Sequence, residues 1–247
     1  MEQWSGVSVP PLVARPLFLL DYDGTLAQIV DDPDHARPHP NAAQILEDLA
    51  ERFPVRLLTG RRVADLARLL QVPQLVAIGV HGLEEGRLGG AVRWRLDEEG
   101  IARLNQVRER LPKIAGVRVE DKGGAIALHY RSATASEAEG EAQVRGELRD
   151  WAQDLPPELE LVWGKKVVEV RPQGFDKGRA ALEIASRHGG ATAVMIGDDT
   201  TDEDAFRALS ALEQESVTIK VGLGESAARY RLAGVDEVIG YLRRYLA

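Results

Sequence analysis

Short apolar runs alternate with amphipathic stretches along most of this chain. The runs are nearly continuous in Leu, Val and Ile, which predicts buried strands over residues 17–20, 55–58, 75–78, 193–196 and 217–221. Apolar residues at helical spacing predict helices over residues 42–53, 62–70, 177–187, 203–209 and 235–246. Asn41 is expected to cap the first of these helices. The alternation predicts an α/β fold, with a doubly wound parallel sheet covered by helices on both faces.

The pattern changes between residues 97 and 172. This segment reads as helix, paired strands, helix and paired strands, which predicts an inserted α+β domain rather than further βαβ units. Its helices are expected near residues 99–111 and 137–155, each with one apolar stripe. We therefore expect a core domain formed by residues 1–96 and 173–247, and an inserted cap domain formed by residues 97–172.

A hairpin is expected at Gly123-Gly124, inside the insertion. A two-residue turn there pairs Arg118 with His129, Glu120 with Ala127 and Lys122 with Ala125, and it places these side chains on one polar face. The opposite face is then apolar, with Val117, Val119, Ile126, Leu128 and Tyr130. The polar face is either the solvent side of an amphipathic sheet or, because alanines lie between charged residues, a floor for a hydroxyl-rich sugar.

Size and composition narrow the class of protein. The chain has 247 residues, 44% of them hydrophobic, a formal net charge of −8 and no cysteine. The negative charge argues against a nucleic-acid partner, and the lack of about 18 consecutive apolar residues argues against a membrane span. The first residues do not resemble a signal peptide, and the lack of cysteine fits a reducing compartment. We expect a cytoplasmic protein, a monomer, that acts on a small molecule.

Acidic residues follow two of the predicted strands. Asp21 and Asp23 come directly after the first strand, and Asp198 follows the strand at 193–196. The carboxyl ends of parallel strands meet at one edge of a sheet, so these three residues are expected to meet there and bind Mg²⁺, which prefers oxygen ligands. The alternative is a surface turn, because Asp-Gly is itself a strong turn signal.

Two further segments fit a phosphate site. Thr59, Gly60 and Arg61 lie between a strand and a predicted helix, so backbone N–H groups and the Thr59 hydroxyl are placed to bind an anion. Lys177 opens another amphipathic helix, where its ammonium can balance phosphate and carboxylate charge. Taken singly, these residues are more typical of a helix cap and a solvated surface group. Their order along the chain favours phosphate chemistry.

Four segments together resemble the motifs of a known superfamily. DYDGTL at 21–26, LLTGR at 57–61, Lys177 and GDDTTDED at 197–204 are similar, in this order, to those of the aspartate-nucleophile phosphatases of the haloacid dehalogenase superfamily. Within it, residues 120–131, 168–172 and 197–206 resemble signatures of the trehalose-6-phosphate phosphatases. The resemblance spans most of the chain.

The resemblance implies a reaction and a role for each acidic residue. Asp21 would attack phosphorus and become an aspartyl phosphate, while Asp23 would protonate the leaving sugar oxygen and later activate water. Mg²⁺ would be held by Asp21, the Asp23 carbonyl and Asp198. Asp199 and Asp202 would orient metal-bound water or Lys177. Thr59 and Lys177 would offset charge on the phosphoryl oxygens.

The resemblance also implies a substrate. Phosphate would be bound by Thr59, Gly60 and Arg61, and the sugar by the cap residues Glu120, Lys122, His129, Arg131 and Glu169. The implied function is Mg²⁺-dependent hydrolysis of trehalose 6-phosphate to trehalose and phosphate, in trehalose biosynthesis. One alternative is a capped phosphatase for another sugar phosphate, such as sucrose phosphate; a more distant one is a phospho-accepting signalling receiver. His81, which follows the third strand, is interpreted as structural.

Overall fold

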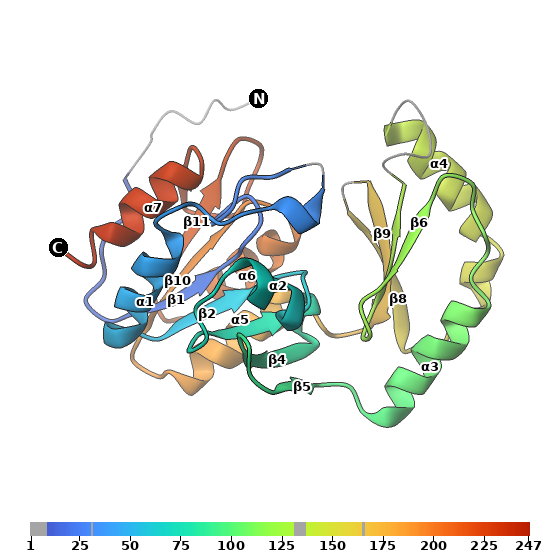
Figure 1. Ribbon diagram of the computed structural model, residues 1–247, viewed down its shortest axis with the longest axis horizontal. Coiled ribbons are helices and arrows are strands. Elements are labelled where there is room, and N and C mark those ends of the chain that lie inside the picture. The colour runs from blue at the N-terminus through green and yellow to red at the C-terminus, as the bar shows by residue number, and fades with distance from the viewer. Residues whose placement is uncertain (1–8, 31, 131–136, 165) are drawn as a thin grey trace. The chain divides into compact units, whose positions relative to one another are not determined.

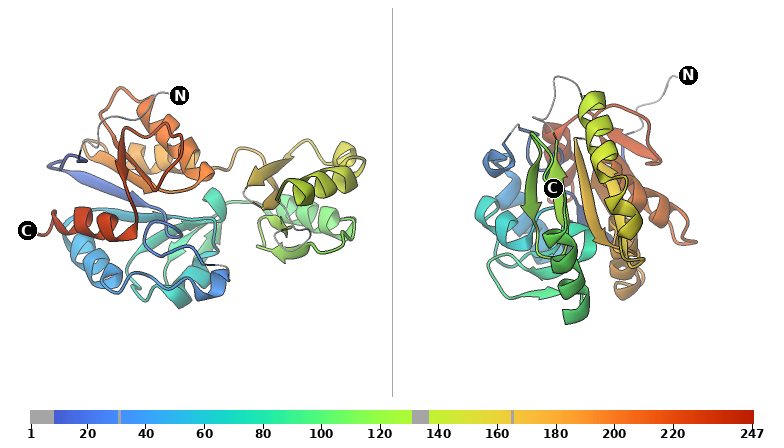
Figure 2. Two further views of the ribbon diagram at one scale, coloured as in Figure 1. Left: turned by 90° about the horizontal axis from the view of Figure 1, so that it is seen from above. Right: turned by 90° about the vertical axis from the view of Figure 1, so that its right-hand side faces the viewer.

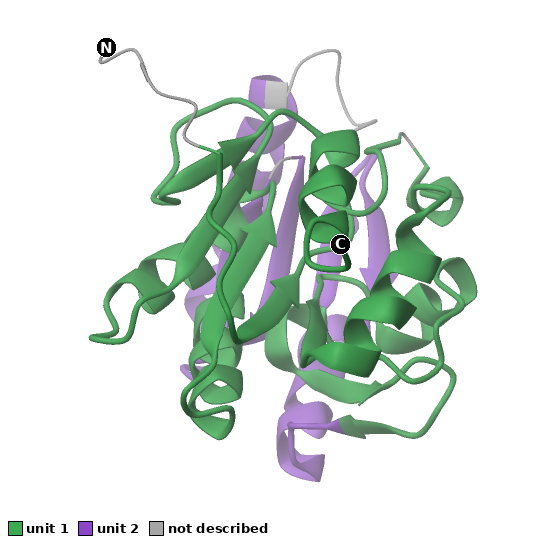
Figure 3. Cartoon of the chain, turned by 90° about the vertical axis from the view of Figure 1, so that its left-hand side faces the viewer, with its two compact units in different colours: residues 1–93, 176–247 green, residues 94–175 purple. Residues whose placement is uncertain are grey.

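The computed structural model describes residues 9–30, 32–130, 137–164 and 166–247. The chain divides into two compact units, one from residues 1–93 and 176–247 and the other from residues 94–175 (Figure 3). The first unit contains both ends of the sequence, so the second unit is an insertion within it. Each unit has its own hydrophobic core.

The first unit is built on an eight-stranded sheet with the order β12-β11-β10-β1-β2-β3-β4-β5 (Figure 1). Adjacent strands from β12 to β3 are parallel, and β4 pairs with β3 in the antiparallel sense. The strands are β1 Pro16–Leu20, β2 Val55–Leu58, β3 Val76–Gly79, β4 Glu84–Arg87, β5 Val92–Trp94, β10 Thr192–Gly197, β11 Val217–Val221 and β12 Tyr230–Leu232.

Helices cover both faces of this sheet, as the continuous apolar strands predict. Phe18 and Leu20 of β1 pack in the cluster that also contains apolar residues of α1 (Ala42–Arg52), α2 (Val63–Leu69) and α7 (Val235–Arg243). Leu17 and Leu19 face the other way, toward α5 (Lys177–Arg187) and α6 (Thr200–Ser210). Figure 2 shows α5 and α6 on one side of β1, with α1 and α7 on the other. The predicted doubly wound α/β fold is confirmed.

The strand order places a topological switch beside β1. The chain proceeds from β1 to β2 and β3 on one side, and from β10 to β11 and β12 on the other. Ligands of open α/β sheets bind at such a switch, beyond the carboxyl ends of the strands. Asp21 follows β1 and Asp198 follows β10, so the acidic residues after both strands lie at the switch.

The second unit is a four-stranded antiparallel sheet with the order β6-β7-β9-β8. Its strands are β6 Arg118–Asp121, β7 Ile126–His129, β8 Leu159–Gly164 and β9 Val167–Pro172, and its helices are α3 Glu98–Glu109 and α4 Glu137–Leu148. The hairpin has the predicted register, with Arg118 opposite His129 and Glu120 opposite Ala127. Leu104 of α3 and Leu148 of α4 pack on the sheet with Leu128, as the apolar stripes predict.

Some local predictions differ from the structure. The helix expected over 137–155 ends at Leu148 and is followed by a short 3-10 helix, Trp151–Asp154. The Asn41 side chain makes no capping hydrogen bond to α1, and Val119, placed on the apolar face, is 47% exposed. The strands β4, β5 and β12 were not predicted, since they are short or polar. Among the described residues, no helix is long and apolar enough to cross a membrane.

Candidate active site

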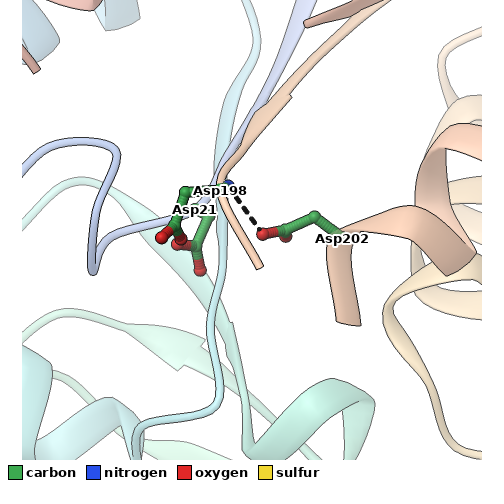
Figure 4. Close-up of side chains that lie close together, drawn as sticks. All are labelled: Asp21, Asp198 and Asp202. Carbon is green, nitrogen blue, oxygen red and sulfur yellow. Dashed lines mark hydrogen bonds between the residues drawn. The ribbon is translucent and has the colours of Figure 1, made fainter. Parts of the chain in front are cut away.

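Three carboxylates gather at the carboxyl ends of β1 and β10. One oxygen each from Asp21, Asp198 and Asp202 lies within 4.8 Å of the others (Figure 4). Asp21 and Asp202 are buried, and Asp198 is half-buried. Two of the three, Asp21 and Asp198, were predicted to meet at this edge of the sheet, although most of the chain separates them in sequence.

Asp202 holds the other members of the site in place. Its Oδ2 accepts hydrogen bonds from the backbone N–H groups of Asp198 and Asp199, both at 3.0 Å, in a capping box at the start of α6. Its Oδ1 accepts a 2.8 Å hydrogen bond from the Lys177 ammonium, which also donates to Asp21 Oδ1 at 2.6 Å. Asp202 thus joins the end of β10 to Lys177 at the start of α5, and Lys177 joins both to Asp21.

Burial and crowded charges shift the protonation of these groups. Burial raises the pKa of Asp21 well above its usual value, and the Asp202 and Asp198 carboxylates add to the rise, while Lys177 opposes it. Burial, with Asp202 and Asp199, raises the pKa of Asp198 to about 7. Burial alone would lower the pKa of Lys177, but the carboxylates of Asp202 and Asp21 raise it, so its ammonium stays charged. Carboxylates outnumber cations in the cluster, which favours an added cation.

Two glycines make room for the carboxylates of the site. Gly24 has φ +75°, a conformation that glycine adopts at little cost, and a Cβ at this position would lie 2.2 Å from Asp198 Cγ. A Cβ at Gly197 would lie 2.2 Å from Asp202 Cγ. Gly24, part of an Asp-Gly turn signal in the sequence, is therefore also the residue at which the segment after β1 closely approaches Asp198.

Asp23 stands apart from the carboxylate cluster. Its two oxygens accept hydrogen bonds from Arg61, at 2.6 Å from Nε and 2.7 Å from Nη2, and Arg61 Nη2 also donates to the Pro33 carbonyl at 2.8 Å. Burial would lower the pKa of Arg61, but its hydrogen bonds to Asp23 raise it. Arg61, which was predicted to bind phosphate, is thus hydrogen-bonded to Asp23, the predicted general acid and base. Asp23 was predicted to bind metal through its backbone carbonyl.

Thr59 and Gly60 follow β2, the neighbour of β1. The Thr59 side chain is buried, its Oγ1 accepts a 3.1 Å hydrogen bond from Arg61 N, and its own N–H donates to the Ile78 carbonyl at 3.0 Å. The helix that follows begins at Val63 rather than at Arg62, and Arg62 is its N-cap residue. The loop between β2 and α2 is therefore longer by one residue than the sequence predicted.

The predicted sugar-binding residues form one ion pair and one hydrogen bond on the sheet of the second unit. Lys122 Nζ lies 2.5 Å from Glu169 Oε1, and His129 Nε2 lies 2.7 Å from Glu120 Oε2. The hydrogen bond with His129 is the main reason that the pKa of Glu120 is lowered. Arg131, the fifth predicted sugar-binding residue, lies outside the described residues.

The alanines between these residues do not form an open floor. Ala125 and Ala127 are 1% and 0% exposed. Lys122 follows β6 and Glu169 lies on β9, with β7 between them, so their ion pair crosses over the strand that carries Ala127. That the alanines form part of a sugar-binding floor stays a prediction.

Sequence reasoning missed Lys220 and Glu203. Lys220 Nζ donates to the Asp198 backbone carbonyl and lies 4.0 Å from Glu203 Oε1, and both residues are 7% exposed. Glu203 also accepts a 2.8 Å hydrogen bond from Ala227 N. A lysine inside the predicted buried strand Val217–Val221 was the available signal, because a buried cation needs an acidic or carbonyl partner.

The cluster is suited to a hard divalent cation. Mg²⁺ prefers carboxylate and carbonyl oxygens, and two or three carboxylates suffice because water and phosphate supply the remaining ligands. Asp21 and Asp198 would provide carboxylate oxygens. Asp202 already accepts three hydrogen bonds, from Lys177, Asp198 and Asp199, which fits an orienting residue better than a direct ligand.

Solved structures with the same fold define the class. This chain is similar to a haloacid dehalogenase-like hydrolase from Bacteroides thetaiotaomicron, with 16% identity, coverage of 94% of this chain and 100% of that chain, and a TM-score of 0.63. The trehalose-6-phosphate phosphatase C-terminal domain of C. albicans matches with 25% identity, coverage of 92% of this chain and 91% of that chain, and a TM-score of 0.74. The fold is that of the haloacid dehalogenase superfamily.

Sequence comparison is more specific. The family model described as Trehalose-phosphatase matches residues 19–236. The trehalose-6-phosphate phosphatase of Escherichia coli (strain K12) is 33% identical over 239 residues, which cover 94% of this chain and 87% of that protein. The chain belongs to the trehalose-phosphatase family, as its sequence motifs imply. It spans about half the length of the curated mycobacterial relatives it matches, for example 53% of the Mycobacterium leprae protein.

Proposed function

We propose that this protein hydrolyses trehalose 6-phosphate to trehalose and phosphate, with Mg²⁺ bound by the carboxylate cluster. The observation on which the proposal depends most is the largely buried cluster of Asp21, Asp198, Asp202 and Lys177, in a chain whose sequence matches the family over residues 19–236. Mg²⁺ would neutralise charge on the phosphoryl oxygens as the phosphoryl group moves.

Asp21 is the proposed nucleophile. Lys177 bonds Asp21 Oδ1, which orients the carboxylate and leaves Oδ2 as the oxygen that attacks phosphorus. A bond from Asp21 to phosphorus forms as the bond from phosphorus to the sugar oxygen breaks, giving an aspartyl phosphate. Water then attacks phosphorus, the bond to Asp21 breaks, and phosphate leaves.

Asp23 is the proposed acid and base. It donates a proton to the leaving sugar oxygen in the first step and accepts a proton from the attacking water in the second. Both of its oxygens accept hydrogen bonds from Arg61, and a cation so placed favours the ionised carboxylate. The first step needs a protonated Asp23, and a protonated oxygen is a weaker hydrogen-bond acceptor for Arg61 than a carboxylate oxygen. We therefore propose that Arg61 moves from Asp23 to the phosphoryl group when substrate binds.

Residues 97–172 are proposed to act as a cap that selects the sugar. Two contacts join its polar side chains, an ion pair between Lys122 and Glu169 and a hydrogen bond between His129 and Glu120. Sugar hydroxyls would replace these contacts on binding, since each can both donate and accept a hydrogen bond. Arg131 belongs to the same proposed set.

Glu120→Ala is expected to lower kcat/KM for trehalose 6-phosphate by about 10–100-fold, the size of one or two lost hydrogen bonds to a charged group. Hydrolysis of a small aryl phosphate, which has no sugar hydroxyls, should change less than about threefold. Glu141→Ala is the matched control, because Glu141 lies on α4 and pairs with Arg145. Equal losses on both substrates would contradict a sugar-binding role for Glu120.

The proposed activity is tested by measuring phosphate release from a panel of trehalose 6-phosphate, sucrose 6-phosphate, glucose 6-phosphate and an aryl phosphate. The proposal predicts the highest kcat/KM for trehalose 6-phosphate. A higher value for sucrose 6-phosphate would favour the alternative of another capped sugar phosphatase. A stable phosphoaspartate without release of phosphate would favour a signalling receiver. The cytoplasmic location and the monomeric state stay predictions.

A further inference from the structure

The segment Gly79–Glu84, which connects β3 to β4, lies against the loop between β2 and α2. Val80 N donates to the Arg61 carbonyl at 3.0 Å, and His81 N donates to the Thr59 carbonyl at 3.1 Å. These two hydrogen bonds hold the backbone on either side of Gly60. The segment therefore contacts the loop that is proposed to bind phosphate.

The backbone of this segment is strained. Val80 has φ 47° and His81 has φ 54°, so two successive residues other than glycine adopt the left-handed conformation. This conformation is costly for residues other than glycine, and it is least favourable for a β-branched side chain such as Val80. Strain of this kind persists where the surrounding structure requires it, and it clusters at functional sites.

The His81 side chain packs against Gly60. A Cβ on Gly60 would lie 2.7 Å from both Cε1 and Nε2 of the imidazole. Because real Cβ atoms do not approach so closely, the ring and a side chain at position 60 exclude each other. The left-handed turn at His81 brings the ring to this position, and the ring in turn limits where the Gly60 backbone can lie.

Glu84 completes the contact at the far end of the loop. It is 1% exposed, its Oε2 accepts a 2.7 Å hydrogen bond from Val63 N, and its Oε1 lies 3.3 Å from Arg62 Nε. Arg62, the N-cap residue, makes no side-chain hydrogen bond to α2. Glu84, the first residue of β4, instead accepts the hydrogen bond from the first turn of the helix.

We infer that His81 and Glu84 are positioning residues for the phosphate-binding loop, Thr59–Val63. Together with the backbone of Val80, they contact every residue of this loop in turn. Their contacts add to the hydrogen bond that the Thr59 hydroxyl accepts from Arg61 N inside the loop. The inference rests on the proposed function, since it assigns these residues to the same phosphate site. It also gives His81, interpreted from the sequence as structural, a positioning role.

His81→Asn tests the role of the ring. Asn tolerates the left-handed conformation, so the turn is retained while the contact of the imidazole ring with Gly60 is removed. A misplaced binding loop is expected to lower kcat/KM for trehalose 6-phosphate by about 10–100-fold, because small displacements of a positioning group cost that much. Inhibition by orthovanadate, a mimic of the transferring phosphoryl group, should weaken by a similar factor. His188→Asn is the matched control, at the end of α5, where its ring contacts the Ile184 carbonyl.

A second test uses the contact with Gly60 itself. Gly60→Ala is expected to lower kcat/KM at least about tenfold more in the unsubstituted chain than in the chain that already carries His81→Asn, because only the imidazole meets the new Cβ. A role in folding alone would lower the melting temperature but would not couple the two substitutions in catalysis or change vanadate inhibition.

The outcomes separate the inference from the proposed function. If the unsubstituted protein releases phosphate and His81→Asn matches it in kcat/KM and vanadate inhibition, the positioning role is wrong and the proposed function stands. Additive effects of Gly60→Ala and His81→Asn would likewise overturn the inference. If the unsubstituted protein releases phosphate from no phosphoester, the proposed function itself fails.

Discussion

Asp21→Asn is expected to lower kcat for trehalose 6-phosphate by about 10⁴-fold or more, the scale seen when a covalent nucleophile is removed. The amide oxygen can still accept the hydrogen bond from Lys177, but the amide is a poor nucleophile. The fold should survive, because Lys177 keeps its partner Asp202. Phosphate release and thermal unfolding measured on the same preparation check both statements.

Asp48→Asn is the matched control for that substitution. Asp48 lies on α1, where its carboxylate accepts a hydrogen bond from Gln44. Its loss should leave kcat unchanged, and the melting temperatures of both variants should lie within about 4 °C of the original, equivalent to about 1 kcal/mol for a protein of this size. Hydrolysis by the Asp21 variant at a near-normal rate would remove Asp21 as the nucleophile.

Lys177→Met has the second largest expected effect. Loss of a group that stabilises developing charge is expected to lower kcat by about 10²–10³-fold. The substitution also leaves the Asp21 and Asp202 carboxylates buried without their common cation, a change that costs about 3–5 kcal/mol in comparable cases. Both kcat and the midpoint of urea unfolding should therefore fall.

Lys177→Met combined with Asp202→Asn separates these two effects. Removing the Asp202 charge relieves the repulsion with Asp21, so the unfolding midpoint should recover in part, while kcat should stay low because the ammonium is still absent. Recovery of kcat along with stability would show that Lys177 acts only on folding. A loss of tenfold or less in the single variant would place Lys177 outside the chemistry.

The fold was predictable because its strands have a simple signal. Runs such as 17–20 and 193–196 are apolar at every position, since helices cover both faces of the sheet. The strands β4 and β5 were missed because they lie toward the edge of the sheet and include polar residues and glycine. The end of α4 at Leu148 was also missed, because Trp151 and Leu155 continue the apolar stripe although the helix has ended.

The parts of the site that depend on strand ends were predictable. The hydrogen bonds and ion pairs between individual side chains were less so. The meeting of Asp21 and Asp198 follows from parallel strands. The pairing of Asp23 with Arg61 does not, because residues near a strand end can pair with any of several cations. The burial of Ala127 could not be predicted either, because the sequence places charges on one face of the sheet but does not give the direction in which long side chains reach.

The acidic cluster at the ends of β1 and β10 is proposed to act through a bound divalent ion. The most direct measurement is phosphate release from trehalose 6-phosphate by protein treated with a chelator, before and after Mg²⁺ is added back. We predict no release above background without the ion, and full release when Mg²⁺ is restored. Equal release with and without Mg²⁺ would contradict the account.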